Sequence, residues 1–330
     1  MATAPTNIRP SLFSAPTGPV TASYRTGPES DSRVLVASDG SIESDTAVRF
    51  AVALTHERGA FPEVLTVVDP MPPLAAGLDP IAASAAAEVY LLEPRADRLA
   101  RIRQQLSAAD PECSEWPVDL QLGQPAALIA QEATRRSAWM VIVGLRTHSV
   151  LERVFRDETA LRVMRRATTP VLAVTPGLTE LPRRIVVGVD FSRASLHAAL
   201  AALPLLASGG TLSLVHVQPK ADFAAKEETE GLGVIYVQGV AAAFARLRDE
   251  LRVPRDIKVE TVYLEGDTPE QLLQFAERTG AELVAVGSQR HSTASRMLLG
   301  SVTTALARAA RCSLLVTPPV RSSGLRGAGR

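Results

Sequence analysis

Short apolar runs alternate along this chain with stretches in which apolar residues recur at helical spacing. Four of the runs are continuous rather than alternating, which is typical of parallel strands covered on both faces. These runs occupy residues 34–38, 141–144, 185–189 and 283–287. Between them, as over residues 47–54 and 196–203, apolar positions follow the i, i+3, i+4, i+7 pattern of an amphipathic helix.

The same order of landmarks occurs twice. Residues 33–41, "RVLVASDGS", resemble residues 184–192, "RIVVGVDFS", and each is an apolar strand ending in an aspartate with a serine two positions later. Three later pairs repeat in order and at nearly constant spacing: "LGQPAALIAQEA" with "EGDTPEQLLQFA", "WMVIVG" with "ELVAVG", and "TTPVLAVTP" with "RCSLLVTPP". This pattern indicates a duplication with its boundary near residues 175–184.

The alternation of strands and helices predicts an α/β protein of two doubly wound domains. Each domain is expected to hold a five-stranded parallel sheet and about four helices. Ligands of such sheets bind beyond the carboxyl ends of the strands, where the strand order reverses. Four residues fall at such ends: Asp39, Gly144, Asp190 and Gly287. The carboxyl edges of the two sheets are therefore candidate sites.

Composition narrows the classes of function. The formal net charge is 0, from 35 basic and 35 acidic residues, so nothing electrostatic favours nucleic acid or an anionic membrane. The only lysines are Lys220, Lys226 and Lys258, and the sequence has no G-x-x-x-x-G-K-[ST], which excludes a P-loop. Cys113 and Cys312 stand in unlike contexts and predict neither a disulfide framework nor a zinc site.

Neither end of the chain has the pattern of a folded domain. Residues 1–31 are rich in Pro, Thr, Ser and Gly and predict a disordered arm, and residues 321–330 predict a flexible tail. The arm lacks the apolar segment of a secretory signal, and no run approaches the roughly 20 apolar residues of a membrane span. We therefore expect a cytoplasmic protein without a membrane partner.

The loop after the last apolar run of the second repeat suggests a ligand. It leaves a strand at Gly287 and enters a helix at Gly300-Ser301, and glycines in such places indicate that the backbone comes close to another group. A Gly-Ser pair at a helix start offers N–H groups and the positive end of the helix dipole, where phosphate is favoured. Asp190, at the carboxyl edge, is placed to accept a hydrogen bond from a ribose hydroxyl or an adenine amine.

These residues resemble those of the universal stress protein family. The chain as a whole resembles a tandem universal stress protein, with domains at residues 32–178 and 182–320. The resemblance implies a Rossmann-like fold, of the adenine nucleotide alpha hydrolase-like kind, in both domains.

Members of the family that bind ATP carry a G-x-x-G-x9-G-[ST] loop between the fourth strand and the last helix. The second repeat follows that frame from Gly287 to Gly300-Ser301, except that Arg290 stands where the family has glycine. The guanidinium of Arg290 either clamps phosphates or fills the space that glycine leaves for them. By resemblance, the nucleotide site comprises Val189, Asp190, Ser192, Val217, Gly287, Ser288, Arg290, Gly300, Ser301 and Val302.

Within this set the resemblance places Val189 and Val217 at the adenine pocket and Asp190 against the nucleoside. Ser192 either caps the first helix of the domain or contacts phosphate. His216, inside an apolar strand, is interpreted as a residue at the edge of the core rather than a ligand.

The first repeat departs further from the family pattern. Its frame has Gly144, then Thr147, then Asp157-Glu158, so that two glycines and the hydroxyl are missing. Asp157 and Glu158 predict an acidic helix start that complements the helix dipole and repels phosphate. We therefore expect a degenerate site in the first domain, where Asp39 is a relic or a cap for the following helix.

The resemblance implies a stress-response protein that binds an adenine nucleotide, ATP with or without Mg²⁺, in its second domain and acts by nucleotide-dependent association. The alternative is a pure protein-interaction module with two degenerate sites. An enzyme is the least favoured class, because no catalytic triad, metal-ligand cluster or catalytic lysine accompanies the loop; slow ATP hydrolysis stays open. His148 and His291, at equivalent loop positions, are interpreted as solvated rather than catalytic.

Universal stress protein domains usually pair through their last strands. The resemblance therefore implies an internal pseudo-dimer in which residues 171–174 pair with residues 314–317, which would bury two strand edges. A homodimer of the whole chain and an unidentified protein partner are also expected. The choice among ATP, ADP, AMP and a cyclic dinucleotide stays open.

Overall fold

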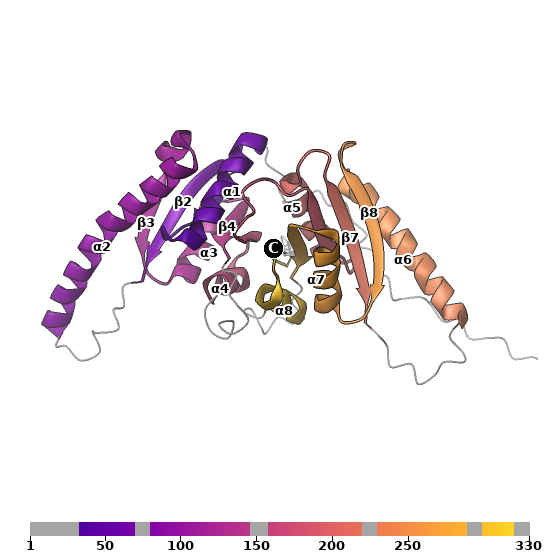
Figure 1. Ribbon diagram of the computed structural model, residues 1–330. Coiled ribbons are helices and arrows are strands. Elements are labelled where there is room, and N and C mark those ends of the chain that lie inside the picture. The colour runs from indigo at the N-terminus through magenta and orange to yellow at the C-terminus, as the bar shows by residue number, and fades with distance from the viewer. Residues whose placement is uncertain (1–32, 70–79, 146–157, 220–229, 289–298, 320–330) are drawn as a thin grey trace, which may run out of the picture.

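The computed structural model describes residues 33–69, 80–145, 158–219, 230–288 and 299–319. The arm and the tail predicted from the sequence lie outside these residues, as do Thr147, His148, Asp157, Arg290 and His291. Within the described residues, ten strands and eight α-helices follow one another as two similar sets (Figure 1).

The first set runs from Arg33 to Val174. Its members are β1 (Arg33–Ala37), α1 (Ile42–Arg58), β2 (Phe61–Val68), α2 (Pro80–Ala109), β3 (Val118–Leu122), α3 (Pro125–Arg135), β4 (Met140–Gly144), α4 (Glu158–Arg166) and β5 (Val171–Val174). The second set consists of β6 (Arg184–Gly188), α5 (Arg193–Ala202), β7 (Thr211–Gln218), α6 (Glu230–Leu251), β8 (Lys258–Glu265), α7 (Thr268–Thr279), β9 (Leu283–Gly287), α8 (Ser301–Ala309) and β10 (Ser313–Thr317). Short 3₁₀ helices follow α2 at Pro111–Glu115 and α5 at Leu203–Leu205.

All the strands form one sheet in the order β3-β2-β1-β4-β5-β10-β9-β6-β7-β8. Neighbouring strands are parallel within each set, as predicted, and β5 and β10 are antiparallel, with Leu172 opposite Leu315. The predicted pairing of the two last strands is confirmed. In each set the strand order reverses beside the first strand, between β1 and β4 and between β6 and β9, which is where ligands of doubly wound sheets bind.

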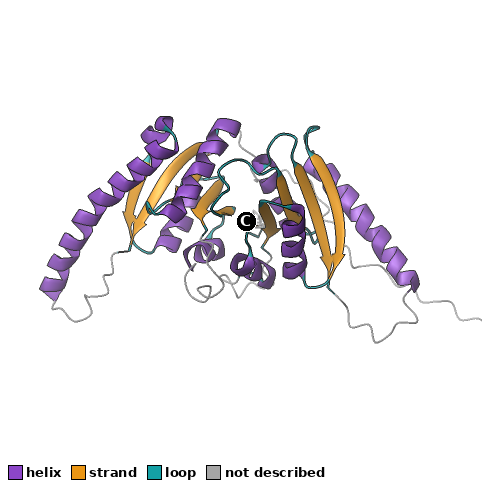
Figure 2. Ribbon diagram, in the orientation of Figure 1, coloured by secondary structure: helices purple, strands orange, loops and turns teal. Residues whose placement is uncertain are grey.

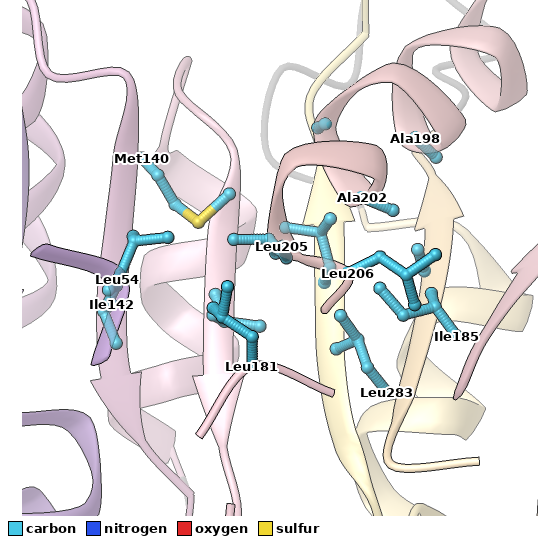
Figure 3. Close-up of a cluster of buried hydrophobic side chains, with 14 of the residues drawn as sticks. Leu54, Met140, Ile142, Leu181, Ile185, Ala198, Ala202, Leu205, Leu206 and Leu283 are labelled. Atoms are coloured by element: carbon cyan, nitrogen blue, oxygen red, sulfur yellow. The ribbon is translucent and has the colours of Figure 1, made fainter. Parts of the chain in front are cut away.

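Helices cover both faces of the sheet (Figure 2). One buried cluster packs the strands against α1, α2, α5 and α6, and the other packs them against α3, α4, α7 and α8. The first cluster is continuous across the two domains, since Leu54 and Met140 belong to it together with Leu205 and Leu206 (Figure 3). The two sets therefore share one core, in addition to the strand pair β5–β10.

Local sequence signals set the helix ends. Ser41 and Ser192 are the N-caps of α1 and α5, and each side chain accepts a hydrogen bond from the amide three residues later, as capping serines do. Gly59 and Gly280 end α1 and α7 in the left-handed conformation that favours glycine. Of the two roles open for Ser192, the structure shows the cap.

A cavity of about 260 Å³ lies between the two domains, lined on one side by the end of α3 and the segments that precede β4 and β5, and on the other by α5 and the end of β10. Its lining includes His197, which is only 6% exposed. Burial, and to a lesser degree the charge of Arg193, lower the pKa of His197 to about 4. The neutral imidazole is therefore the form that the folded protein favours.

Acid should consequently destabilise the protein through His197. The pKa of histidine in the unfolded chain is about 6.5, so the unfolded state binds more protons and stability falls as the pH drops from about 6.5 to 4, by roughly 1–3 kcal/mol. His197→Gln should flatten the free energy of unfolding over that window in urea titrations. An unchanged slope in His197→Gln would contradict the assignment.

Candidate functional site

The strand register brings most of the predicted site residues of the second domain to one edge. Gly188, the last residue of β6, is paired with Val215 of β7 on one side and Val286 of β9 on the other. The residues that follow these positions are side by side for that reason. They include Val189, Asp190, Val217, Gly287 and Ser288.

Asp190 is exposed at this edge, and its Oδ1 accepts a hydrogen bond from the amide of Ser192 at 3.0 Å. This turn directs the chain from β6 into α5, where the Ser192 hydroxyl accepts from the amide of Ser195 at 3.3 Å. The carboxylate is thus held at the mouth of the edge, where it can accept from hydroxyl or amine donors of a ligand.

Val189 and Val217, expected at an adenine pocket, are both buried, at 4% and 7% exposed. They belong to the two different core clusters and so pack on opposite faces of the sheet. His216 Nδ1 donates to the Val189 carbonyl over 2.8 Å, because a carbonyl oxygen can only accept. The prediction of His216 as an edge-of-core residue agrees with its partly buried position.

Phe191 is a member of this edge that sequence reasoning missed. It lies between Asp190 and Ser192 with φ at +60°, a conformation that few residues other than glycine adopt. Its ring packs on His216, with centroids 4.7 Å apart, and edge-on against Phe244 at 5.1 Å. The corresponding residue of the first repeat is Gly40, with φ at +73°. The alignment of an aromatic residue with a glycine was therefore the sequence signal that could have identified Phe191.

Gly287, at the end of β9, packs closely against the backbone of α5. A Cβ at this position would lie 2.3 Å from the backbone carbon and oxygen of Ala194, in the first turn of α5. Gly144 meets α1 in the same way, with the Glu43 carbonyl oxygen 2.2 Å from the added Cβ. The two strand-end glycines are therefore required by helix packing, and they are no sign of a ligand by themselves.

The start of α8 fits the predicted phosphate site better. Gly300 is the N-cap, with φ at −56° and ψ at 154°, and, being glycine, it offers no side chain to cap the helix. Ser301 is exposed and Val302 is half-buried. An uncapped helix start leaves backbone N–H groups for an anion.

The first domain has a cleft of about 530 Å³ at the equivalent edge. The counterparts of six predicted site residues line it. These are Ser38 for Val189, Asp39 for Asp190, Ser41 for Ser192, Val67 for Val217, Gly144 for Gly287 and Thr159 for Val302. In the first domain, the counterparts of these six predicted residues therefore line one cleft.

Charge in the first-domain cleft is mixed. Asp39, Glu43, Asp69 and Arg98 all line it. Desolvation opposes ionisation of the Asp39 carboxyl, but hydrogen bonds from Ser41 and Ser44 and the charge of Arg98 outweigh that effect and lower its pKa. Asp39 Oδ1 accepts from the amide of Ser41 at 3.0 Å, so it supports the turn before α1. No sequence motif surrounds Arg98, and its place in the cleft lining becomes apparent only from the packing of α2.

No group of three or more His, Cys, Asp or Glu side chains among the described residues is arranged to hold a metal ion. None of the helices in the described part of the chain is both long and apolar enough to cross a membrane.

The fold defines a tandem, doubly wound α/β protein with one candidate ligand edge in each half. The model of the universal stress protein family matches residues 32–175 and again residues 182–318. The chain therefore belongs to the universal stress protein family, with two domains of that family in tandem.

Individual relatives agree with this assignment. A universal stress protein from Methanocaldococcus jannaschii is 27% identical over 140 residues, covering 41% of this chain and 82% of that protein. One from Bacillus subtilis is 26% identical over 148 residues, covering 40% and 97%. The crystal structure of a universal stress protein from Archaeoglobus fulgidus matches with a TM-score of 0.60 at 18% identity, covering 87% of this chain and 98% of that one, which shows that the tandem fold is shared.

Proposed function

We propose that this protein is a stress-response protein that binds an adenine nucleotide, with ATP as the first candidate, in its second domain. The observation that carries the proposal is the edge formed by the ends of β6, β7 and β9, where the exposed carboxylate of Asp190 follows the last residue pair of the paired strands. The uncapped start of α8 at Gly300 belongs to the same domain. The cleft at the equivalent edge of the first domain supports it, because the matching residues there surround a hollow of ligand size.

Each part of the edge would serve a different part of the nucleotide. The N–H groups around Gly300 and Ser301 would hold phosphate oxygens with the favourable end of the helix dipole. Asp190 would accept from the ribose or the adenine amine. Mg²⁺, where present, would be held mainly by the phosphates and water, since the described residues supply no carboxylate cluster for it.

Binding is proposed to change association rather than to drive catalysis. A second copy of this chain is the first partner to test, by analytical ultracentrifugation with and without ATP. The competing candidate, a pure interaction module, is favoured by one observation: packing against α5 fully accounts for Gly287, which removes one of the three residues that suggested a phosphate loop.

ATP at about 100 times its dissociation constant should raise the free energy of unfolding by roughly 2.7 kcal/mol through ligand linkage. Gly300→Glu should abolish most of this gain, because it places a carboxylate at the proposed phosphate position. The backbone at Gly300 has a negative φ that any residue adopts, so the variant should fold. Urea denaturation of the full chain with and without ATP measures the gain, and calorimetric titration measures the binding of ATP to each form.

Asp190→Ala should also reduce ATP binding by a large fraction, and Asp39→Ala is its matched control. Each substitution removes an aspartate that accepts from the amide two residues later at 3.0 Å. Asp39→Ala also removes the hydrogen bond with Ser44 and the attraction of Arg98, so the folding of both variants is checked before their binding is compared. Loss of binding in Asp39→Ala alone would move the nucleotide to the first domain. If no form binds ATP, and mass spectrometry detects no nucleotide retained on purification, the interaction-module alternative is favoured.

A further inference from the structure

A second hollow adjoins the cleft of the first domain. It measures about 440 Å³ and shares Asp69, Pro125 and Thr159 with the cleft. Its remaining lining consists of Gln124, Ala126, Arg162, Arg165 and Arg166. A hollow of this size accepts a small molecule or part of one, and its three guanidinium groups set the charge that such a molecule should carry.

Positive charge dominates this hollow. Three arginines of α4 face one carboxylate, that of Asp69. Arg165 and Arg166 form no ion pair with any carboxylate that the structure describes. A guanidinium presents several N–H donors in a planar fork that suits phosphate and carboxylate oxygens. Two such groups, in a recess and with no partner among the described residues, leave donors for an oxyanion.

The start of α3 adds to the same wall. Gln124 is its N-cap and makes no side-chain capping bond, and Pro125 at the first helical position has no N–H to offer. The amide of Ala126, which lines the hollow, is among the groups that an uncapped helix start leaves for a ligand. The dipole of α3 therefore acts in the same direction as the arginines.

The second domain shows that the fold does not require these features. At the position of Gln124 it has Asp267, whose Oδ1 accepts from the amide of Glu270 at 3.1 Å and caps α7. Arg162, Arg165 and Arg166 correspond to Ala305, Arg308 and Ala309 on α8. One arginine is enough to complement the end of α8, so the two additional arginines of the first domain have no counterpart in the shared architecture.

We propose that the hollow formed by Arg162, Arg165, Arg166 and the start of α3 binds the phosphate group of a phosphorylated small molecule. The arginines lie four to eight residues beyond Glu158, the first residue of α4, or about 6–12 Å along the helix. The arginines thus lie beyond the first turn of that helix, although Thr159 at its start also lines the hollow. The proposed site is independent of nucleotide binding in the second domain.

Inorganic pyrophosphate is the probe, titrated calorimetrically into the full chain carrying Gly300→Glu, so that the second domain does not contribute. One pyrophosphate should bind per chain. Adding Arg165→Gln and Arg166→Gln should weaken binding about tenfold or more, because two charge-assisted contacts are lost. The thermal midpoint should stay unchanged, since neither arginine has an ion-pair partner in the described chain.

Arg308→Gln, the change at the second-domain counterpart of Arg165, is the matched control and should bind pyrophosphate as its parent does. Equal affinity in the Arg165→Gln/Arg166→Gln form, or no binding beyond a reference of matched ionic strength, would overturn the proposal. Competition by AMP would show that the phosphate enters attached to a nucleoside that fills the cleft. Retained binding without competition would identify a free oxyanion.

Discussion

Gly287→Ala is expected to destabilise the protein by about 3 kcal/mol or more, although it adds a single methyl group. The added Cβ would lie 2.3 Å from two backbone atoms of Ala194 and 2.8 Å from the amide nitrogen of Ser195. No side-chain rotation relieves such a contact, so either α5 or β9 must move. Both are fixed, α5 by its cap at Ser192 and β9 by pairing with β6 and β10.

Gly144→Ala should have a comparable effect in the first domain, where the added Cβ would meet the Glu43 carbonyl oxygen. Gly300→Ala is the control, because Gly300 has an ordinary negative φ at the start of α8, and it should cost less than about 1 kcal/mol. Urea denaturation of the three variants gives the comparison. A Gly287→Ala protein with the wild-type midpoint would show that α5 can yield freely at this contact.

The fold could be predicted because its signals are local and repeated. Continuous apolar runs identified the parallel strands, and the duplication fixed the order of elements in both halves. The resemblance to the family then implied that the last strands pair, as Leu172 and Leu315 do.

The candidate site could be predicted only in part, because its geometry depends on contacts between distant segments. Gly287 fits a phosphate-loop pattern, yet its partner is Ala194, far earlier in the chain, and no local pattern reveals that contact. Phe191 in a left-handed conformation is disfavoured on local grounds and is offset by ring packing on β7 and α6. The three arginines of α4 suggest an anion site only because the structure places them in one hollow with the start of α3. No local sequence pattern indicates that placement.

Arg136 illustrates a buried charge that sequence reasoning overlooked. It follows the last residue of α3, and its side chain is 10% exposed. The guanidinium donates to Glu63 at 2.8 Å, to Glu132 at 2.9 Å and to Asp119. These contacts join α3 to β2 and β3, so Arg136 anchors the helix whose other end forms the arginine-lined hollow.

Glu132 is the most buried of these carboxylates, with its side chain 6% exposed. Hydrogen bonds from Arg135 and, to a lesser degree, Arg136 lower the pKa of Glu132 to about 2, against the opposing effect of burial. Because the folded pKa lies below the unfolded one, this stabilisation is complete above about pH 4.5 and is lost as the pH falls through 2. That window lies below the one in which His197 acts.

Arg136→Ala should therefore destabilise the protein by about 3–5 kcal/mol at neutral pH, since it leaves Glu132 buried without its least exposed partner. Arg135→Ala is the matched control: its guanidinium contacts the same carboxylate at 2.6 Å but is 62% exposed, so solvent screening should make it much less destabilising than Arg136→Ala. Arg135 makes the larger contribution to the pKa of Glu132, whereas Arg136 alone bridges three carboxylates that lie on separate elements. Urea denaturation at pH 7 measures both variants, and Arg136→Ala should also lose less stability on acidification, because Glu132 then has a pKa nearer to its unfolded value. Equal costs for the two arginines would mean that water reaches the whole cluster and that α3 is anchored by its apolar face instead.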